Sequence, residues 1–158
     1  MKGLTHLDES GRARMVDVSD KEATVRTATA GGRLTCQQQT LEKVRAGIAP
    51  KGSVIHTAEL AGIMAAKRTA ELIPLCHPLP LTNIEVHIEI DEALSGFRVT
   101  SDVRTTAVTG VEMEALTAVS VACLTLFDML KAIDRTMVIG GIEVTSRTGG
   151  KSGDWHGR

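Results

Sequence analysis

Thr109–Ile133, TGVEMEALTAVSVACLTLFDMLKAI, is the longest apolar-rich run in the chain, and the rest of the fold has to accommodate it. Ala, Leu, Val and Met fill most positions, and neither Pro nor Gly occurs after Gly110, so the run predicts a long helix. Thr109 followed three residues later by Glu112 has the pattern of a capping box, in which each side chain bonds a free backbone N–H. A helix that is apolar around most of its circumference is predicted to be buried.

This helix nevertheless carries a polar stripe. At about 100° per residue, one side of the helix collects Glu114, Thr117, Asp128 and, nearer the edge, Lys131. Buried charges are costly unless they find partners. We therefore expect other segments to bring polar groups to the stripe, and we expect the helix to form the floor of a pocket.

Length and composition predict one domain over residues 1–158, with flexible ends at 1–14 and about 148–158. The net charge of −1 and the presence of only two Phe, one Trp and no Tyr disfavour a nucleic-acid binder or an anionic-membrane binder. An anionic small substrate would have to be bound by a local cluster of basic groups.

The three cysteines, Cys36, Cys76 and Cys123, are odd in number and widely spaced, with no C-x-x-C pair. This pattern predicts neither a zinc site nor a disulfide framework, and it favours a reducing compartment such as the cytoplasm. The first residues lack an apolar signal-peptide core, and no charge-free apolar run reaches about 18 residues. We therefore expect no signal peptide, no membrane span and no metal cofactor.

The predicted elements alternate between strands and helices. Strands are expected at 15–18, 23–30, 83–90, 97–104 and 137–147, and helices at 37–46, 53–68 and 109–133. The glycine pairs at 31–32 and 140–141 indicate bulges, and 49–52 has the composition of a turn. From residue 23 onward this order predicts an α+β fold of the ferredoxin-like split βαβ type, an antiparallel sheet with helices packed on one face.

Asp128 and Lys131 are spaced i, i+3 on the long helix, which leaves two interpretations open. They form an ordinary intrahelical ion pair, or, in a helix otherwise so apolar, a shielded acid–base pair with shifted pKa values. At the start of the same helix, Glu112 is best explained as a cap. Glu114 has no such structural role.

The segment 71–81 holds three of the four prolines and is expected to be a stiff, extended, apolar loop. It carries Cys76 and His77. Neighbouring side chains usually point apart, so a catalytic Cys–His pair is disfavoured. His77 fits a structural role and a ligand-binding role equally well on its own, and the stiff loop favours binding.

Basic residues are scattered beside turns and on strands, and each one alone is explained by a solvated surface charge. They are Arg26, Lys51, Lys67, Arg104, Arg147 and Lys151. The run Gly149–Ser152 resembles the end of a P-loop, but Thr145 replaces the required glycine and too few residues follow for a helix. Only a weak anion-binding signal remains there.

Several strings in chain order resemble the molybdenum cofactor biosynthesis protein C family, whose members are cyclic pyranopterin monophosphate synthases. They are MVDVS at 15–19, KG at 51–52, AGIMAAKRTAELIPLCHPL at 61–79, TGVEMEALTAVSVACLTLFDMLKA at 109–132, MVIGGI at 137–142 and GGKSG at 149–153. The resemblance runs across nearly the whole chain with matching spacing. LIPLCHPL and TGVEMEAL are its most specific strings.

The resemblance implies a homohexamer, a trimer of dimers, with active sites at the dimer interfaces and no cofactor. It implies a lyase that converts 3′,8-cyclo-7,8-dihydroguanosine 5′-triphosphate to cyclic pyranopterin monophosphate and releases pyrophosphate. Two alternatives are a non-enzymatic nucleotide-binding domain and a purely structural assembly protein.

The resemblance also implies residue roles. Asp128 matches the acid–base position, with Lys131 beside it and Lys51 in the same catalytic group. Substrate contacts are implied for Leu75, Cys76, His77, Met113, Glu114, Lys67, Arg26, Arg104, Glu112 and Arg147. The family usually has Lys at the position of Arg147. Arginine keeps the charge but cannot readily lose a proton, so phosphate binding is expected to survive there and proton transfer is not.

Overall fold

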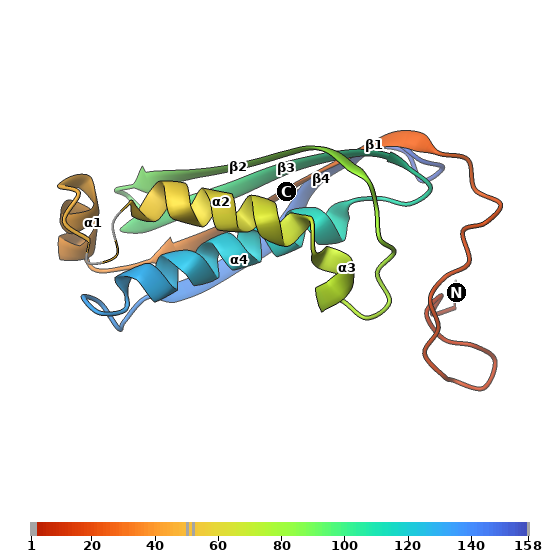
Figure 1. The fold of residues 1–158 in the computed structure, drawn as a ribbon, viewed down its shortest axis with the longest axis horizontal. Coiled ribbons are helices and arrows are strands. Elements are labelled where there is room, and N and C mark those ends of the chain that lie inside the picture. Colours follow the sequence, from red (N-terminus) through yellow and green to blue (C-terminus); the bar gives the residue numbers. More distant parts are fainter. Residues whose placement is uncertain (1–2, 50, 52, 158) are drawn as a thin grey trace.

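The computed structural model describes residues 3–49, 51 and 53–157. Its body has two layers, a five-stranded antiparallel sheet and a layer of helices that covers one face of the sheet (Figure 1). The strands are β1 (Thr24–Thr35), β2 (Leu81–Asp91), β3 (Gly96–Ala107), β4 (Val138–Thr148) and β5 (Trp155–His156), in the order β2-β3-β1-β4-β5. The helices are α1 (Gln38–Arg45), α2 (Val54–Ala66), α3 (Thr69–Leu72) and α4 (Glu112–Leu130).

The β2–β3 hairpin confirms the sequence prediction, because each strand alternates between a buried and an exposed side chain. Val86 and Ile88 on β2 and Val99 on β3 point into the core. The intervening charged and polar side chains face the uncovered side of the sheet. The α+β architecture with helices on one face is therefore confirmed.

Helix α4 lies beside α2 in the helix layer and packs against β1, β3 and β4, while α2 packs against β2. Ten of its residues are buried, among them Val119 and Leu126 with no exposed surface. Glycine allows α2 to approach α4 closely, since a Cβ added to Gly62 would lie 2.8 Å from the carbonyl oxygen of Ala118. By length and composition α4 could cross a membrane. Its packing explains the apolar composition instead, because the helix is the centre of the protein core.

The predicted irregularities at the two glycine pairs are both present. Pairing between β1 and β4 shifts register between Gly31 and Arg33, and Gly141 has a φ of 62°. A side chain at Gly32 would collide with Val119 of α4, with its Cβ 2.7 Å from Cγ1. These glycines let the sheet bend closely over the helix.

Two sequence predictions are wrong in detail. Residues 15–18 form no strand, because this segment has no partner strand; it runs as coil between an isolated Leu7–Ala13 bridge and β1. The predicted helix 53–68 ends at Ala66, and α3 follows as a separate turn of helix. The C-terminal segment expected to be flexible contributes β5, which pairs with β4. The expected turn at 49–52 includes Pro50 and Gly52, which lie outside the described residues.

The predicted capping box is also wrong. Helix α4 begins at Glu112 after Val111, and no side chain caps it. The Glu112 carboxylate folds back over Gly110, where a side chain would overlap it, and accepts a hydrogen bond from Arg147 at 3.0 Å. The Glu112 carboxylate therefore pairs with Arg147 of β4 and does not form the cap that the local pattern predicted.

Candidate active site

The predicted site residues gather at the two ends of α4. We name Lys51, Asp128 and Lys131 the aspartate cluster, and Cys76, Glu112, Glu114 and Arg147 the glutamate cluster. Asp128 follows Glu114 by fourteen positions on the helix, which at 1.5 Å per residue separates them by about 21 Å. One chain therefore does not bring the two clusters into one pocket.

Asp128 is held between two lysines. Its Oδ2 accepts a hydrogen bond from Lys51 Nζ at 2.8 Å, and its Oδ1 contacts Lys131 Nζ at 3.0 Å. Lys51 first, and then Lys131, holds the pKa of Asp128 below its ordinary value. The Asp128 side chain is 56% exposed, so the shielded carboxyl expected from the sequence is not found within one chain. The cluster presents an ionised carboxylate with an excess of one positive charge.

Glu114 has the opposite environment. It is only 3% exposed, and burial raises the pKa of its carboxyl, with the nearby charge of Glu112 adding to the effect. Its Oε1 is 3.8 Å from the Cys76 Sγ, whereas its Oε2 has no hydrogen-bond partner among the described residues. A buried, unpaired carboxyl oxygen is costly, which makes it a candidate for pairing with a ligand.

Asp134 shows what a satisfied buried carboxylate looks like in this fold. It is also 3% exposed, yet it accepts hydrogen bonds from the backbone of Gln37 and Thr136 and from the hydroxyls of Thr40 and Thr136. Burial opposes ionisation, but these four bonds outweigh it and lower the pKa of Asp134. Asp134 thereby ties the start of α1 to the turn after α4. Among the residues that the structure describes, the unpaired oxygen of Glu114 is the exception.

A small cavity of about 140 Å³ adjoins Glu114 and is lined by the end of α2, by α3 and by the proline loop. Lys67, the C-cap residue of α2, is on its wall. Cys76 is half-buried beside Glu114, and burial together with the Glu114 charge raises the pKa of its thiol to about 11. A thiol with this pKa stays protonated, which argues against nucleophilic catalysis.

Arginines form the other wall of the glutamate cluster. The Arg147–Glu112 ion pair joins β4 to the start of α4, and both side chains are 28% exposed. Arg26 donates hydrogen bonds to the carbonyls of Ala107 and Val108. Gly150 has a φ of 76°, and a side chain there would overlap the Arg26 guanidinium. Gly150 of the GGKSG string therefore packs against an arginine, a structural role that the P-loop comparison did not reveal.

Other predicted residues lie apart from both clusters or point elsewhere. Arg104 is on the uncovered face of the sheet, since its neighbour Thr105 is the buried residue of that strand. The His77 Nε2 contacts the carbonyl oxygen of Val16 at 2.7 Å. Leu75 is half-buried, and Met113 is 38% exposed beside Glu114 on α4.

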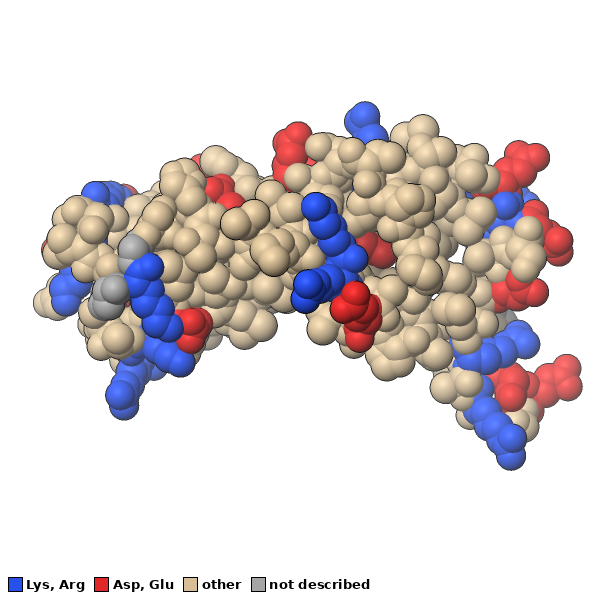
Figure 2. Space-filling model, in the orientation of Figure 1, with Lys and Arg blue, Asp and Glu red and all other residues tan. Residues whose placement is uncertain are grey.

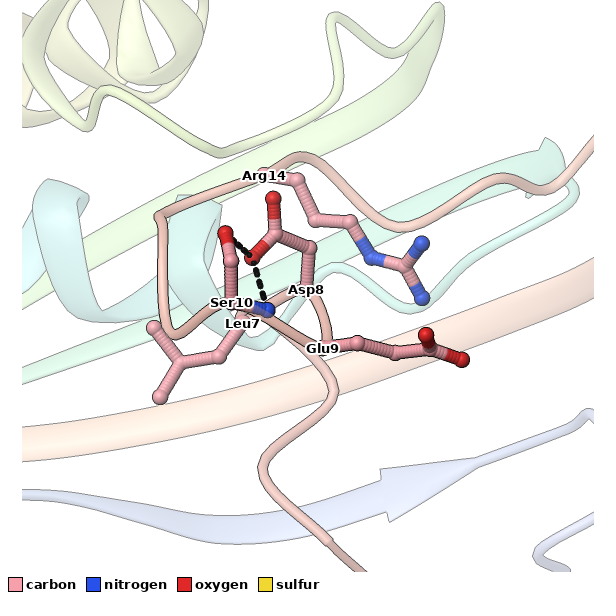
Figure 3. A pocket seen from close by; sticks show the side chains of 5 residues that line it. All are labelled: Leu7, Asp8, Glu9, Ser10 and Arg14. Carbon is pink, nitrogen blue, oxygen red and sulfur yellow. Dashed lines mark hydrogen bonds between the residues drawn. The ribbon is translucent and has the colours of Figure 1, made fainter.

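On the face that carries the helices, basic side chains gather at the α1 end, in the middle beside α3, and near the N-terminus (Figure 2). A hollow of about 560 Å³ is lined by residues that belong to neither cluster, namely Leu7, Asp8, Glu9, Ser10 and Arg14 (Figure 3). Within residues 3–49, 51 and 53–157, no group of three His, Cys, Asp or Glu side chains is arranged to hold a metal ion.

The fold and the two clusters define an α+β protein with paired basic and acidic groups at both ends of its central helix. The sequence profile of the MoaC family matches residues 15–150. The chain belongs to the MoaC family.

Relatives with assigned names are similar over nearly their whole length. A protein of Methylobacterium sp. (strain 4-46) is 59% identical over 155 residues, which is 98% of this chain and 97% of the relative. Proteins of Methylobacterium nodulans (60% identity, 97% and 96% covered) and Nostoc sp. (58%, 96% and 90%) are similarly close. Each of the three is named cyclic pyranopterin monophosphate synthase.

Proposed function

We propose that this protein is a cyclic pyranopterin monophosphate synthase of molybdenum cofactor biosynthesis. It is a lyase that converts 3′,8-cyclo-7,8-dihydroguanosine 5′-triphosphate to cyclic pyranopterin monophosphate and pyrophosphate. Membership of the MoaC family and the names of its relatives support this assignment. The observation that carries it is Asp128, held ionised between two lysines at the end of the family's central helix.

The aspartate cluster supplies the proton transfers. Rearranging a purine into a pterin moves protons, and an ionised carboxylate beside ammonium groups offers both an acceptor and a donor. Asp128 accepts a proton while Lys131 or Lys51 donates one. The second lysine keeps a positive charge in the site for the phosphates. No cofactor is required for these steps.

The glutamate cluster binds the substrate. Burial favours the protonated form of the Glu114 carboxyl. In that form Glu114 can both donate and accept hydrogen bonds to the ring of the base. Lys67, His77, Arg26 and Arg147 provide donors for the phosphates, and they stabilise the charge that develops on the departing pyrophosphate. Leu75, Cys76 and Met113 line the same end of the helix.

Both clusters act on one substrate only if two chains meet. Acid–base groups must lie within about 3 Å of the proton that they move, and about 21 Å of helix separates Asp128 from Glu114 in one chain. We therefore place the active site at a dimer interface, where one chain contributes its aspartate cluster and its partner the glutamate cluster. A two-fold interface produces two such sites, and three dimers form the hexamer. Arg104, on the opposite face, reaches a site only from a further subunit.

Complementation between inactive subunits tests this arrangement. Asp128→Asn and Glu114→Ala are expected to abolish activity when each is assembled alone. Mixed after dissociation and reassembly, they should recover roughly a quarter of the wild-type sites, because each mixed dimer has one intact site. Pyrophosphate release is the assay. A mixture as inactive as its parents, with mixed oligomers confirmed by mass spectrometry, would contradict the shared site.

The alternatives give different results with the same substrate. A non-enzymatic nucleotide-binding domain would bind it tightly without forming product, and a structural assembly protein would not bind it.

We place the protein in the cytoplasm, because Cys36, Cys76 and Cys123 are all free thiols.

A further inference from the structure

The N-terminal arm, residues 3–18, lies outside the two-layer body and extends beyond its α3 end (Figure 1). Most of its side chains are exposed, and the first residue of the hydrophobic core is Ala28. The arm therefore contributes little to the stability of the core. The end of the arm together with Ser19 forms the string MVDVS, to which neither the fold nor the proposed chemistry gives a role.

The arm nevertheless contacts a proposed substrate-binding residue. The carbonyl oxygen of Val16 lies 2.7 Å from Nε2 of His77, a contact between residues 61 positions apart. A carbonyl oxygen only accepts hydrogen bonds, so the Nε2 of His77 must carry the proton. Among the described residues the ring makes no other hydrogen bond, which leaves Nδ1 as the nitrogen available to a ligand.

A local turn holds the Val16 carbonyl in place. Asp17 Oδ1 accepts hydrogen bonds from the backbone N–H of Ser19 at 2.9 Å and from the Ser19 hydroxyl at 2.5 Å. The N–H of Lys21 donates to the Val18 carbonyl at 3.1 Å. The bond from the Ser19 hydroxyl is the main reason that the pKa of Asp17 lies below its ordinary value. The carboxylate is thus ionised, and the turn formed, at neutral pH.

We propose that Val16 is a positioning residue for His77. Its main-chain carbonyl binds Nε2–H and orients the imidazole, so that Nδ1 is offered to a substrate phosphate. In the imidazolium form Nδ1–H donates to the phosphate while Nε2–H keeps its bond to Val16, which makes the phosphate bond charge-assisted. This role rests on the proposed function, whereas the tautomer and the orientation of His77 do not.

The arm offers a matched pair of carboxylates for the test. Asp8 makes the same kind of turn as Asp17: its Oδ1 accepts from the N–H and the hydroxyl of Ser10 and from the N–H of Arg12 (Figure 3). Both aspartates carry one charge; Asp17 is exposed and Asp8 is half-buried. They differ in that only Asp17 adjoins the residue that contacts His77.

Three full-length variants separate the possibilities. Asp17→Ala should raise the KM for the substrate about fivefold, the effect of one hydrogen bond of about 1 kcal/mol, with kcat little changed. Asp17→Asn keeps the acceptor oxygen and should restore the wild-type KM. Asp8→Ala should leave KM and kcat unchanged. Equal effects of Asp17→Ala and Asp8→Ala, or no effect of Asp17→Ala, would overturn the proposal.

A spectroscopic measurement needs no turnover. In the full-length protein labelled with ¹⁵N-histidine, neutral His77 should be wholly in the Nε2–H tautomer. Its Nε2 proton should exchange with solvent more slowly than in Asp17→Ala, and Asp8→Ala should match the wild type. A neutral His77 in the Nδ1–H tautomer, with no proton on Nε2, would refute the positioning role even if the enzyme is active. Slow exchange in a protein that releases no pyrophosphate would refute the proposed function alone.

Discussion

The two ends of α4 place carboxyl groups in opposite environments. Asp128 is exposed and bound by two lysines, which lower its pKa, whereas Glu114 is buried with one oxygen unpaired, and burial raises its pKa. Groups whose pKa values are pushed apart commonly take different roles in one reaction. The comparison assigns proton transfer to the aspartate cluster and substrate recognition to the glutamate cluster.

The largest expected effect tests the aspartate half of this comparison. Asp128→Asn keeps the shape and removes the proton acceptor, and Lys131→Ala removes a proton donor. Each should lower kcat by about 10² to 10⁴-fold, the usual contribution of a general acid or base. The KM should change far less. The measurement is pyrophosphate release at saturating substrate, with melting temperatures as the check on folding. Near-normal rates for both variants would contradict the assignment of proton transfer to the aspartate cluster.

A smaller effect tests the glutamate half. Arg147→Ala removes one charged partner of a phosphate and should raise KM about tenfold, since a charge-assisted hydrogen bond contributes about 1.5 kcal/mol or more. Arg147→Lys keeps the charge at this position and is the matched control, so its KM should stay within about twofold of the wild type. If Arg147→Ala lowered kcat as strongly as Asp128→Asn does, the glutamate cluster would not be limited to substrate recognition, and the proposed division of roles between the two clusters would be wrong.

The fold was largely predictable because its strongest signals are local. Alternation in β2 and β3 needs only the order of residues, and so does the apolar run of α4. Predictions failed where a distant partner decides. Arg147 of β4 takes the carboxylate of Glu112 from the expected cap, and residues 15–18 alternate like a strand but find no strand to pair with.

The candidate site shows the same limit. The i, i+3 spacing predicted the contact of Asp128 with Lys131, but nothing in the spacing could place Lys51, 77 positions away, on the other oxygen. That residue came from the family resemblance. The separation of the two clusters was, in contrast, readable from the sequence. Fourteen residues of a straight helix span about 21 Å, so residues on one stripe need not share one pocket.

The smallest expected effect, on stability, compares the two carboxyls directly. Burial raises the pKa of Glu114 in the folded protein above its unfolded value, which is near 4.5. The stability associated with the protonated Glu114 is therefore fully present below the unfolded pKa, and it is lost as the pH rises through the raised folded pKa. Glu114→Gln removes the ionisation and should stabilise the protein at neutral pH by about 1 kcal/mol, or about 3 °C in Tm. In acid the advantage should vanish. Melting curves recorded between pH 4 and pH 8 measure the difference in stability between Glu114→Gln and the wild type.

Asp128→Asn is the control, because its expected change in stability at neutral pH has the opposite sign. A folded pKa below the unfolded value means that the stability contributed by Asp128 is present above its ordinary value of 3.8 and is lost as the pH falls through the lowered folded pKa. Asp128→Asn should therefore be less stable than the wild type at neutral pH, and the difference should shrink in acid. The size of this difference should also fall with added salt, because the pair is exposed. Differences that run in the same direction for both variants would mean that the two ends of α4 do not provide opposite environments.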